Sequence, residues 1–259
     1  MYRSLAVLLS GLMLVAAPVW AGAPPWERVE AVQNVLDGET PVRGAIHLDL
    51  PLVSRDGSAV PLTVEVDSPM SEDDYVASIH LFAVSNPYPE IATIHLTPRM
   101  GQAKVATRVR LNESQRVVAV ARTNTGRVYA DAREVRVTVA GCLARDATYD
   151  SDTLMLARVR APERFSAGEP GEVTTLINHP METGLRKNGD GNLIPRRIVH
   201  RVAASVGAET VMEAELHRSV SADPYLRFFV APVEDGTLTV RWDEEGGESA
   251  VREESLRLR

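Results

Sequence analysis

The sequence predicts an all-β protein made of two β-sandwiches in tandem. Short stretches of alternating apolar and polar residues recur about every 10 residues, as in antiparallel sandwiches, and turns rich in Gly, Pro, Asn and Asp separate them. Valine is abundant, and β-branched side chains favour packed strands over helices. A polar run at 145–152 divides these stretches into two groups, so we expect one sandwich on each side of it.

Residues 1–23 are predicted to be a secretory signal peptide. Arg3 precedes an apolar run over 5–15, and small residues follow at 21–23; this order of charged, apolar and small residues is typical of such signals. The apolar run is shorter than the roughly 20 residues of a membrane-spanning helix. We therefore expect cleavage after Ala21 or Ala23 and no membrane span in the mature protein. A retained N-terminal anchor is the alternative.

The first sandwich is expected over residues 24–141 and begins with a short amphipathic helix. Its apolar side chains recur at steps of three and four residues: Trp26, Val29, Val32 and Leu36. Pro25 suits the start of this helix and Asp37-Gly38 its end, and we expect the helix to cover the open edge of the sandwich. The predicted strands that follow lie at 45–50, 60–66, 75–84, 91–96, 103–111, 117–122, 128–130 and 133–139.

A linker over 142–152 separates this sandwich from a second one over 153–259. The strands predicted there lie at 153–161, 172–178, 196–205, 210–217, 226–231 and 237–242. Residues 188–192 read Asn-Gly-Asp-Gly-Asn, and because glycine accepts a positive φ, this run predicts a tight hairpin turn.

Composition and motifs argue against several classes of function. The formal net charge is −7 and no basic patch of five or more Lys and Arg residues is present, so nucleic acid is not an expected partner. The chain has no Gly-rich phosphate loop and no Gly-x-Ser-x-Gly motif. Six histidines lie in separate strands or turns without the spacing of a zinc site: His47, His80, His95, His179, His200 and His217. We expect a protein that is not an enzyme and has no metal or cofactor.

Cys142 is the only cysteine and cannot form a disulfide within the chain. In an oxidising compartment its thiol must be buried, joined to another molecule such as a second copy of the chain, or kept reactive. Cys142 follows Ala140-Gly141 at the end of a predicted strand and precedes the polar run. Such connecting segments lie at the surface and often carry function, so the position favours a presented thiol over a packed one. Arg145 would favour the thiolate, which is the nucleophilic form, and Asp146 would oppose it.

Several motifs resemble the two subunits of the SoxYZ carrier of bacterial thiosulfate oxidation. Similarity to the Y subunit lies in DSPMSEDDYV at 67–76, IHLFA at 79–83, NP at 86–87 and VAGC at 139–142. Similarity to the Z subunit lies in HPMETGLR at 179–186 and GNLIPRR at 191–197. The chain thus resembles a fused SoxYZ-like protein, of the kind associated with periplasmic quinoprotein dehydrogenases.

The resemblance implies immunoglobulin-like sandwiches, a periplasmic location and a role for Cys142. In the family, a Gly-Gly-Cys-Gly-Gly arm takes sulfur intermediates covalently on its cysteine and swings between enzymes. Cys142 matches that cysteine, but Gly141 alone remains of the four glycines, so the arm is less flexible. The second sandwich also tethers the segment at its far side.

The resemblance therefore implies a periplasmic, non-catalytic carrier that binds a small sulfur-containing group on Cys142. Its partners would be periplasmic redox or sulfur-processing enzymes, among them a quinoprotein dehydrogenase system. Gly141 would give the segment flexibility, and Arg145 would help to form the thiolate. The alternative is a binding or assembly module for a quinoprotein dehydrogenase, in which Cys142 is purely structural.

Overall fold

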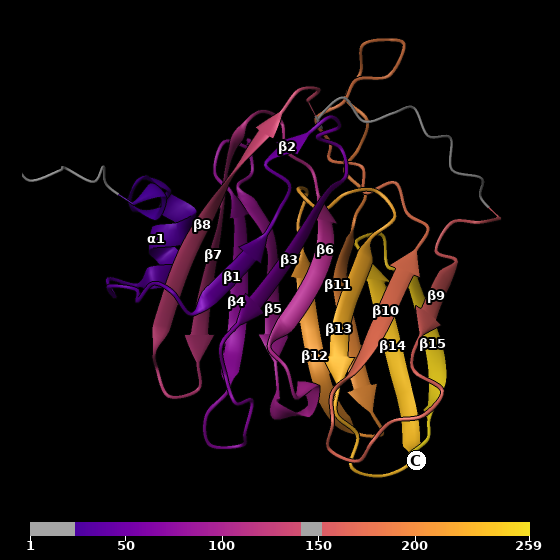
Figure 1. Cartoon of the computed structure of the whole chain (residues 1–259). Coiled ribbons are helices and arrows are strands. Elements are labelled where there is room, and N and C mark those ends of the chain that lie inside the picture. Colours follow the sequence, from indigo (N-terminus) through magenta and orange to yellow (C-terminus); the bar gives the residue numbers. More distant parts are fainter. Residues whose placement is uncertain (1–23, 141–151) are drawn as a thin grey trace, which may run out of the picture.

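The computed structural model describes residues 24–140 and 152–259. Within them, fifteen strands form two stacked sheets, and one short α-helix lies near the N-terminal side of the first half (Figure 1). The arrangement confirms the predicted all-β fold of two immunoglobulin-like sandwiches in tandem. The signal peptide expected at 1–23 lies outside the described residues. No helix in the described parts of the chain has the length and apolar character needed to cross a membrane.

The first half contains eight of the strands. These are β1 (Ile46–Asp49), β2 (Val53–Ser54), β3 (Val60–Val66), β4 (Val76–Ala83), β5 (Glu90–Leu96), β6 (Lys104–Val109), β7 (Gln115–Thr123) and β8 (Val128–Val137). The second half contains β9 (Ala157–Arg160), β10 (Gly171–Ile177), β11 (Val199–Val206), β12 (Glu209–Leu216), β13 (Tyr225–Val230), β14 (Gly236–Glu244) and β15 (Ser249–Leu256). A 3-10 helix, η2 (Pro98–Met100), precedes β6.

Both sheets run from the first half into the second. The six-stranded sheet has the order β1-β3-β6-β13-β10-β9, and the nine-stranded sheet has the order β15-β14-β11-β12-β5-β4-β7-β8-β2. The halves join where β5 pairs with β12, from Leu96–Met212 to Ala92–Leu216, and where Ala106 of β6 pairs with Arg227 of β13. One cluster of buried apolar side chains extends through both halves. The two sandwiches are therefore joined edge to edge, while the expected boundaries at 141, 152 and 153 stay a prediction.

Three predicted strands need correction, and two strands, β2 and β15, were not predicted. The two strands expected at 128–130 and 133–139 are one strand, β8, and the strand expected at 153–161 is only β9 because a turn occupies 152–155. β2 has only two residues, too few for a visible alternation. β15 was missed because most of its side chains are exposed or partly exposed, as an edge strand permits.

The predicted helix is present in two parts, η1 (Pro25–Arg28) and α1 (Glu30–Leu36), and α1 ends at Asp37 with a left-handed φ of 51°. The sequence predicted that this helix would cover an edge, and that prediction is wrong: the helix covers the outer face of the nine-stranded sheet. The reason is a second apolar patch on that face, to which Trp26, Val32 and Leu36 add their buried side chains. The sheet contributes Phe82, Val118, Val120, Val128 and Ala130.

Candidate functional site

The residues predicted to form the site, Gly141, Cys142 and Arg145, lie outside the described residues. The structure does place the chain on both sides of them, up to Ala140 and again from Asp152. Both places lie at the end of the sandwich toward which β6 and β8 run (Figure 1). We call this the junction end; it comprises residues 108–112, 137–140, 152–156 and 178–197.

The segment that leads from β8 toward Cys142, which we call the departing chain, is fixed to the end of β6. Beyond β8, the carbonyl of Val139 accepts a hydrogen bond from the Gly57 amide at 2.8 Å, and the carbonyl of Gly57 accepts one from the Leu111 amide at 2.8 Å. The side chain of Val139 is 58% exposed. The chain is therefore held by its backbone up to Val139, three residues before Cys142.

The segment from Asp152 to β9, which we call the returning chain, is fixed to Asn178. In the turn that precedes β9, the Met155 amide donates to the Asn178 carbonyl at 2.9 Å, and the Asn178 amide donates to the Leu156 carbonyl at 3.1 Å. Asn178 directly precedes the 179–186 motif. The end of the linker and the first residues of this motif therefore form one hydrogen-bonded unit.

His179 is the buried centre of that motif. Its side chain is fully buried, and its Nδ1 accepts a hydrogen bond from the Met181 amide at 3.1 Å. Burial, together with smaller effects of the nearby charges of Arg197 and Arg110, lowers the pKa of His179 to about 4. His179 is therefore neutral at pH 7 with its proton on Nε2, and this atom has no hydrogen-bond partner in the described part of the chain. Its Nδ1 thus holds the Met181 amide in the loop.

Arg110 connects the motif to the first half. The guanidinium donates from Nη1 to the Met181 carbonyl at 2.5 Å and from Nη2 to the Pro180 carbonyl at 2.9 Å. Arg110 is only 4% exposed. Because Leu111 holds the departing chain through Gly57, the adjacent residues 110 and 111 link the departing chain to the loop that holds the returning chain. No sequence motif pointed to Arg110, since its partners are about 70 residues away.

Asn86, in the NP motif, holds the backbone of Arg110 by a hydrogen bond. Its Nδ2 donates to the Arg110 carbonyl at 2.8 Å and to Ser219 Oγ at 2.9 Å, and its Oδ1 accepts from Gln115 Nε2 at 2.8 Å. The Arg110 amide also donates to the Ser219 carbonyl at 2.7 Å. Motifs from the two halves thus meet at the junction end.

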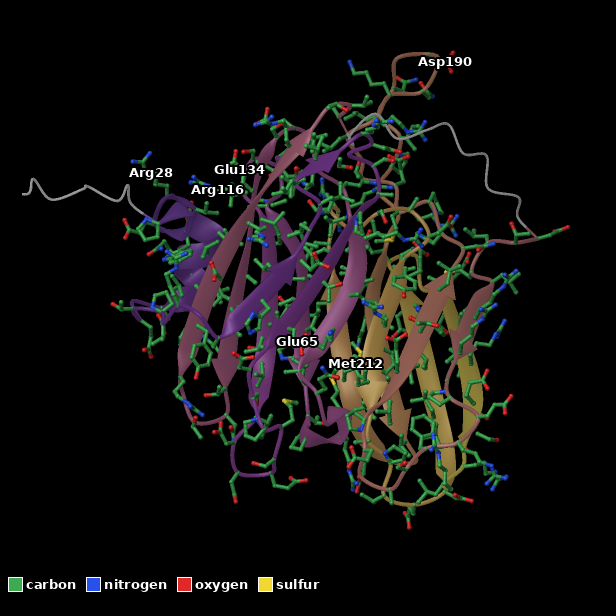
Figure 2. The ribbon with its side chains drawn as sticks, in the orientation of Figure 1. Arg28, Glu65, Arg116, Glu134, Asp190 and Met212 are labelled. Atoms are coloured by element: carbon green, nitrogen blue, oxygen red, sulfur yellow. The ribbon has the colours of Figure 1, made fainter. Side chains whose placement is uncertain are left out.

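A cavity of about 640 Å³ opens beside the 179–186 motif. Three arginines line it and each has a carboxylate partner: Arg186 with Glu182 at 2.9 Å, Arg196 with Glu245 at 2.6 Å and Arg197 with Glu244 at 3.5 Å. Pro180, Ile194 and Pro195 add apolar surface. Asp190 marks the tip of the neighbouring hairpin in Figure 2, where the Asn188 amide donates to the Asn192 carbonyl at 2.8 Å as the predicted turn requires. Paired charges and apolar walls suit a protein segment better than a free ion.

His80 and His95 lie on the paired strands β4 and β5. His80 Nε2 is 3.0 Å from Ser78 Oγ, and its Nδ1 is 3.3 Å from Thr93 Oγ1. Burial lowers the pKa of His80 to about 4, with smaller effects of His95 and Arg122. Among residues 24–140 and 152–259, no group of three or more His, Cys, Asp or Glu side chains could hold a metal ion.

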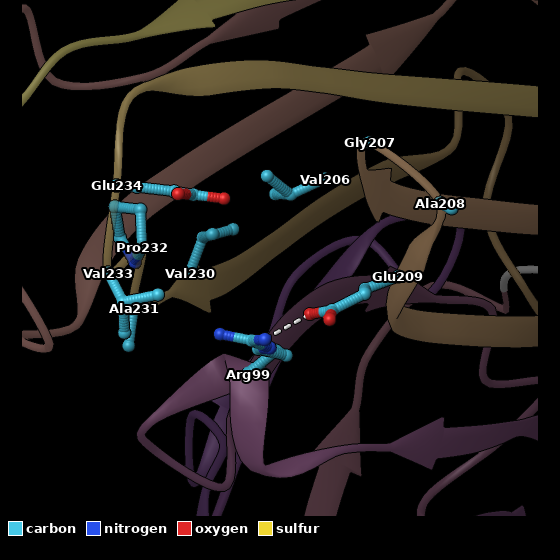
Figure 3. A pocket seen from close by; sticks show the side chains of 10 residues that line it. All are labelled: Arg99, Val206, Gly207, Ala208, Glu209, Val230, Ala231, Pro232, Val233 and Glu234. Carbon is cyan, nitrogen blue, oxygen red and sulfur yellow. Dashed lines mark ion pairs between the residues drawn. The ribbon is translucent and has the colours of Figure 1, made fainter.

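A smaller cavity of about 280 Å³ lies at the opposite end of β6, where η2 meets the β11–β12 turn and the loop after β13 (Figure 3). Arg99 of η2 forms an ion pair with Glu209 across its mouth. We call this the opposite end.

Two family models match separate parts of the chain. The model described as sulfur oxidation protein SoxY matches residues 32–142, and the model described as sulphur oxidation protein SoxZ matches residues 159–255. Both matched ranges agree with the halves that the strands form.

Solved structures show weaker likenesses. The sulfur carrier protein SoxY from Chlorobium limicola f thiosulfatophilum is 27% identical, with a TM-score of 0.36, over 42% of this chain and 94% of that chain. A superoxide reductase (neelaredoxin) from Ignicoccus hospitalis is 15% identical, with a TM-score of 0.33, over 36% of this chain and 80% of that chain. A comparison with curated proteins found no match.

Proposed function

The chain joins a domain of the SoxY family to a domain of the SoxZ family in one polypeptide, and we propose that it is a periplasmic carrier of a small sulfur-containing group bound covalently to Cys142. The carrier presents this group to separate sulfur-processing enzymes and catalyses no reaction itself. The match of the first family model extends to Cys142.

The observation that carries the proposal is the shared anchoring of the chain on both sides of Cys142. Before Cys142, Leu111 is hydrogen-bonded to Gly57, and Gly57 to Val139. After Cys142, the chain is hydrogen-bonded to Asn178. Asn178 directly precedes the loop that accepts the hydrogen bonds from Arg110. At about 3.3 Å per residue, the three residues from Val139 allow Cys142 a reach of about 10 Å. The carried group would therefore be presented at the junction end, beside the cavity lined by Glu182 and Arg197. A partner enzyme would accept a loop there and not a free arm.

Loading requires only thiol chemistry. The Cys142 thiolate attacks a donor sulfur that bears a leaving group; a sulfur–sulfur bond forms, and the electron pair of the broken bond departs with the leaving group. The proton of the thiol goes to solvent, and no external oxidant is needed. Arg145 would raise the thiolate fraction of Cys142, and Gly141 would let the segment bend.

Intact-mass measurement of the protein isolated from the periplasm, before and after a reductant, tests the proposal. We expect an added mass that the reductant removes and that is absent from the Cys142→Ser variant. The matched control moves the thiol by three residues, as Val139→Cys in the Cys142→Ser background, because the side chain of Val139 is exposed. This variant should react with a bulky alkylating reagent but should not carry the adduct.

An unmodified Cys142 in the isolated protein would contradict the carrier and would favour a module that binds or assembles a periplasmic quinoprotein dehydrogenase. A mass of two chains that a reductant halves would assign the thiol to a Cys142-linked dimer and would also contradict it. An equal adduct on the Val139→Cys control would show exposure of a thiol without a specific site.

A further inference from the structure

A third cavity, of about 210 Å³, lies on the outer face of the six-stranded sheet. Three arginines line it, Arg108, Arg158 and Arg160, and the described residues contribute no carboxylate to its lining. This distinguishes it from the junction-end cavity, where each arginine has an acidic partner. Leu176 and Tyr225 add apolar and aromatic surface to the lining.

Strand register explains why these arginines meet. Arg158 of β9 is opposite Leu176 of β10, and Leu176 is opposite Tyr225 of β13. The guanidinium of Arg108, at the end of β6, lies over the Tyr225 ring at 5.4 Å from its centroid. Arg160 lies two residues along β9 from Arg158, and side chains two apart on a strand share a face. β6 belongs to the first half and β9, β10 and β13 to the second, so the cavity exists only because the halves are joined.

The positive charge in this cavity is not balanced within the described parts of the chain. Arg158 and Arg160 are exposed and form no ion pair or side-chain hydrogen bond with residues 24–140 or 152–259. Arg108 donates from Nη2 to the backbone carbonyl of Asp223 at 3.3 Å. The cavity therefore has a local excess of three positive charges, although the formal net charge of the whole chain is −7.

We propose that this cavity binds a small oxyanion with two negative charges, such as sulfate or thiosulfate. Guanidinium groups present paired N–H donors that match the oxygens of such anions, and Thr174 and Tyr225 bring hydroxyl groups to the lining. A water molecule occupies about 30 Å³ in the liquid, so the cavity has room for a tetrahedral oxyanion and part of its hydration shell. The site does not depend on Cys142 and goes beyond the carrier function.

The test is a calorimetric titration of the full chain with sodium sulfate, and separately with sodium thiosulfate, at constant ionic strength set with sodium chloride. We expect saturable binding that Arg158→Gln/Arg160→Gln weakens about tenfold, as the loss of two charge-assisted contacts predicts. The matched control is Arg28→Gln/Arg133→Gln, which removes the same charge from exposed arginines of the first half; Arg28 is labelled beside α1 in Figure 2. This control should bind as the unaltered chain does.

Binding must also persist in the Cys142→Ser variant, which separates this site from the proposed carrier function. Equal weakening in the Arg28→Gln/Arg133→Gln control would assign the effect to net charge and overturn the site. Heats no larger than those of a chloride titration would overturn it as well. Binding of an octaglutamate peptide without binding of sulfate would instead make the surface a contact for an acidic protein. Thermal unfolding of each variant verifies that it is folded.

Discussion

At the junction end, a buried arginine of the first half donates hydrogen bonds to backbone carbonyls of the second half. At the opposite end, the arginine of the first half forms a surface ion pair instead, beside hydrogen bonds from the Ala231 amide to the Arg99 carbonyl and from Thr97 Oγ1 to the Thr210 carbonyl. Arg110 is 4% exposed and has two carbonyl partners. In the pair at the opposite end, the side chains of Arg99 and Glu209 are 35% and 59% exposed. Buried donors cannot exchange their partners for water without cost, but exposed charges can. The contrast indicates that Arg110, at the end from which the Cys142 segment departs, contributes more to the join between the halves than Arg99 does.

Substitution of Arg110 should have the largest effect. Arg110→Met leaves the Pro180 and Met181 carbonyls without these donors, and we expect the free energy of unfolding to fall by about 3 kcal/mol. Chemical denaturation of the full chain measures this loss. Arg110→Lys keeps the charge but not the fork of donors, so its loss should be intermediate. A loss from Arg110→Met no greater than that from Arg99→Gln would remove the contrast between the ends.

The junction end should also be sensitive to acid through His179. Its pKa is about 4 in the folded chain against about 6.5 in an unfolded one, so between these values the unfolded state binds the extra proton. Stability is therefore lost as pH falls from 6.5 toward 4, and between pH 7 and 5 this group should account for about 2 kcal/mol. His179→Gln, whose side-chain oxygen can still accept from Met181, should flatten the pH dependence by that amount.

Nuclear magnetic resonance titration of the His179 ring in the folded chain provides an independent check. We expect a titration midpoint near pH 4, since burial lowers the pKa of the ring. A midpoint near 6.5 would show that water reaches the ring and that the loop at 179–186 is looser than its contacts indicate. His80 has the same lowered pKa, so His179→Gln should flatten the pH dependence without abolishing it.

Strand alternation made most of the fold predictable, because most strands bury one face only; the exception is the part of the nine-stranded sheet that α1 covers. β3 shows this best: Val60, Leu62, Val64 and Val66 are buried in strict alternation. β15 lacks the signal because residues 252–254 are charged and solvated at a sheet edge. The sequence predicted two strands where the structure has β8, because the charged Asp131 interrupts the run of apolar residues. In the structure the Asp131 carboxylate forms an ion pair with Arg43 at 3.3 Å.

The candidate site was predictable only in part. The motifs at 86–87 and 179–186 were recognised by resemblance, and the structure shows both at the join between the halves: Asn86 donates to Ser219, and Pro180 and Met181 accept from Arg110. Arg110 and the cluster at Arg158 could not be found, because their neighbours come from distant strands whose register no local pattern encodes. Cys142, Gly141 and Arg145 lie outside the described residues, so their roles stay predictions.

The smallest effect is expected at the opposite end. Arg99→Gln removes an ion pair that is largely solvated, and such pairs contribute about 0.5 kcal/mol, so the free energy of unfolding should change by no more than this amount. A double-mutant cycle with Glu209→Gln isolates the pair from other effects of each substitution, and raising the salt concentration should shrink the coupling further. A coupling as large as the loss from Arg110→Met would mean that both ends are fixed alike. The departure of the Cys142 segment from the junction end would then need a reason other than rigidity, such as access to the cavity beside Glu182.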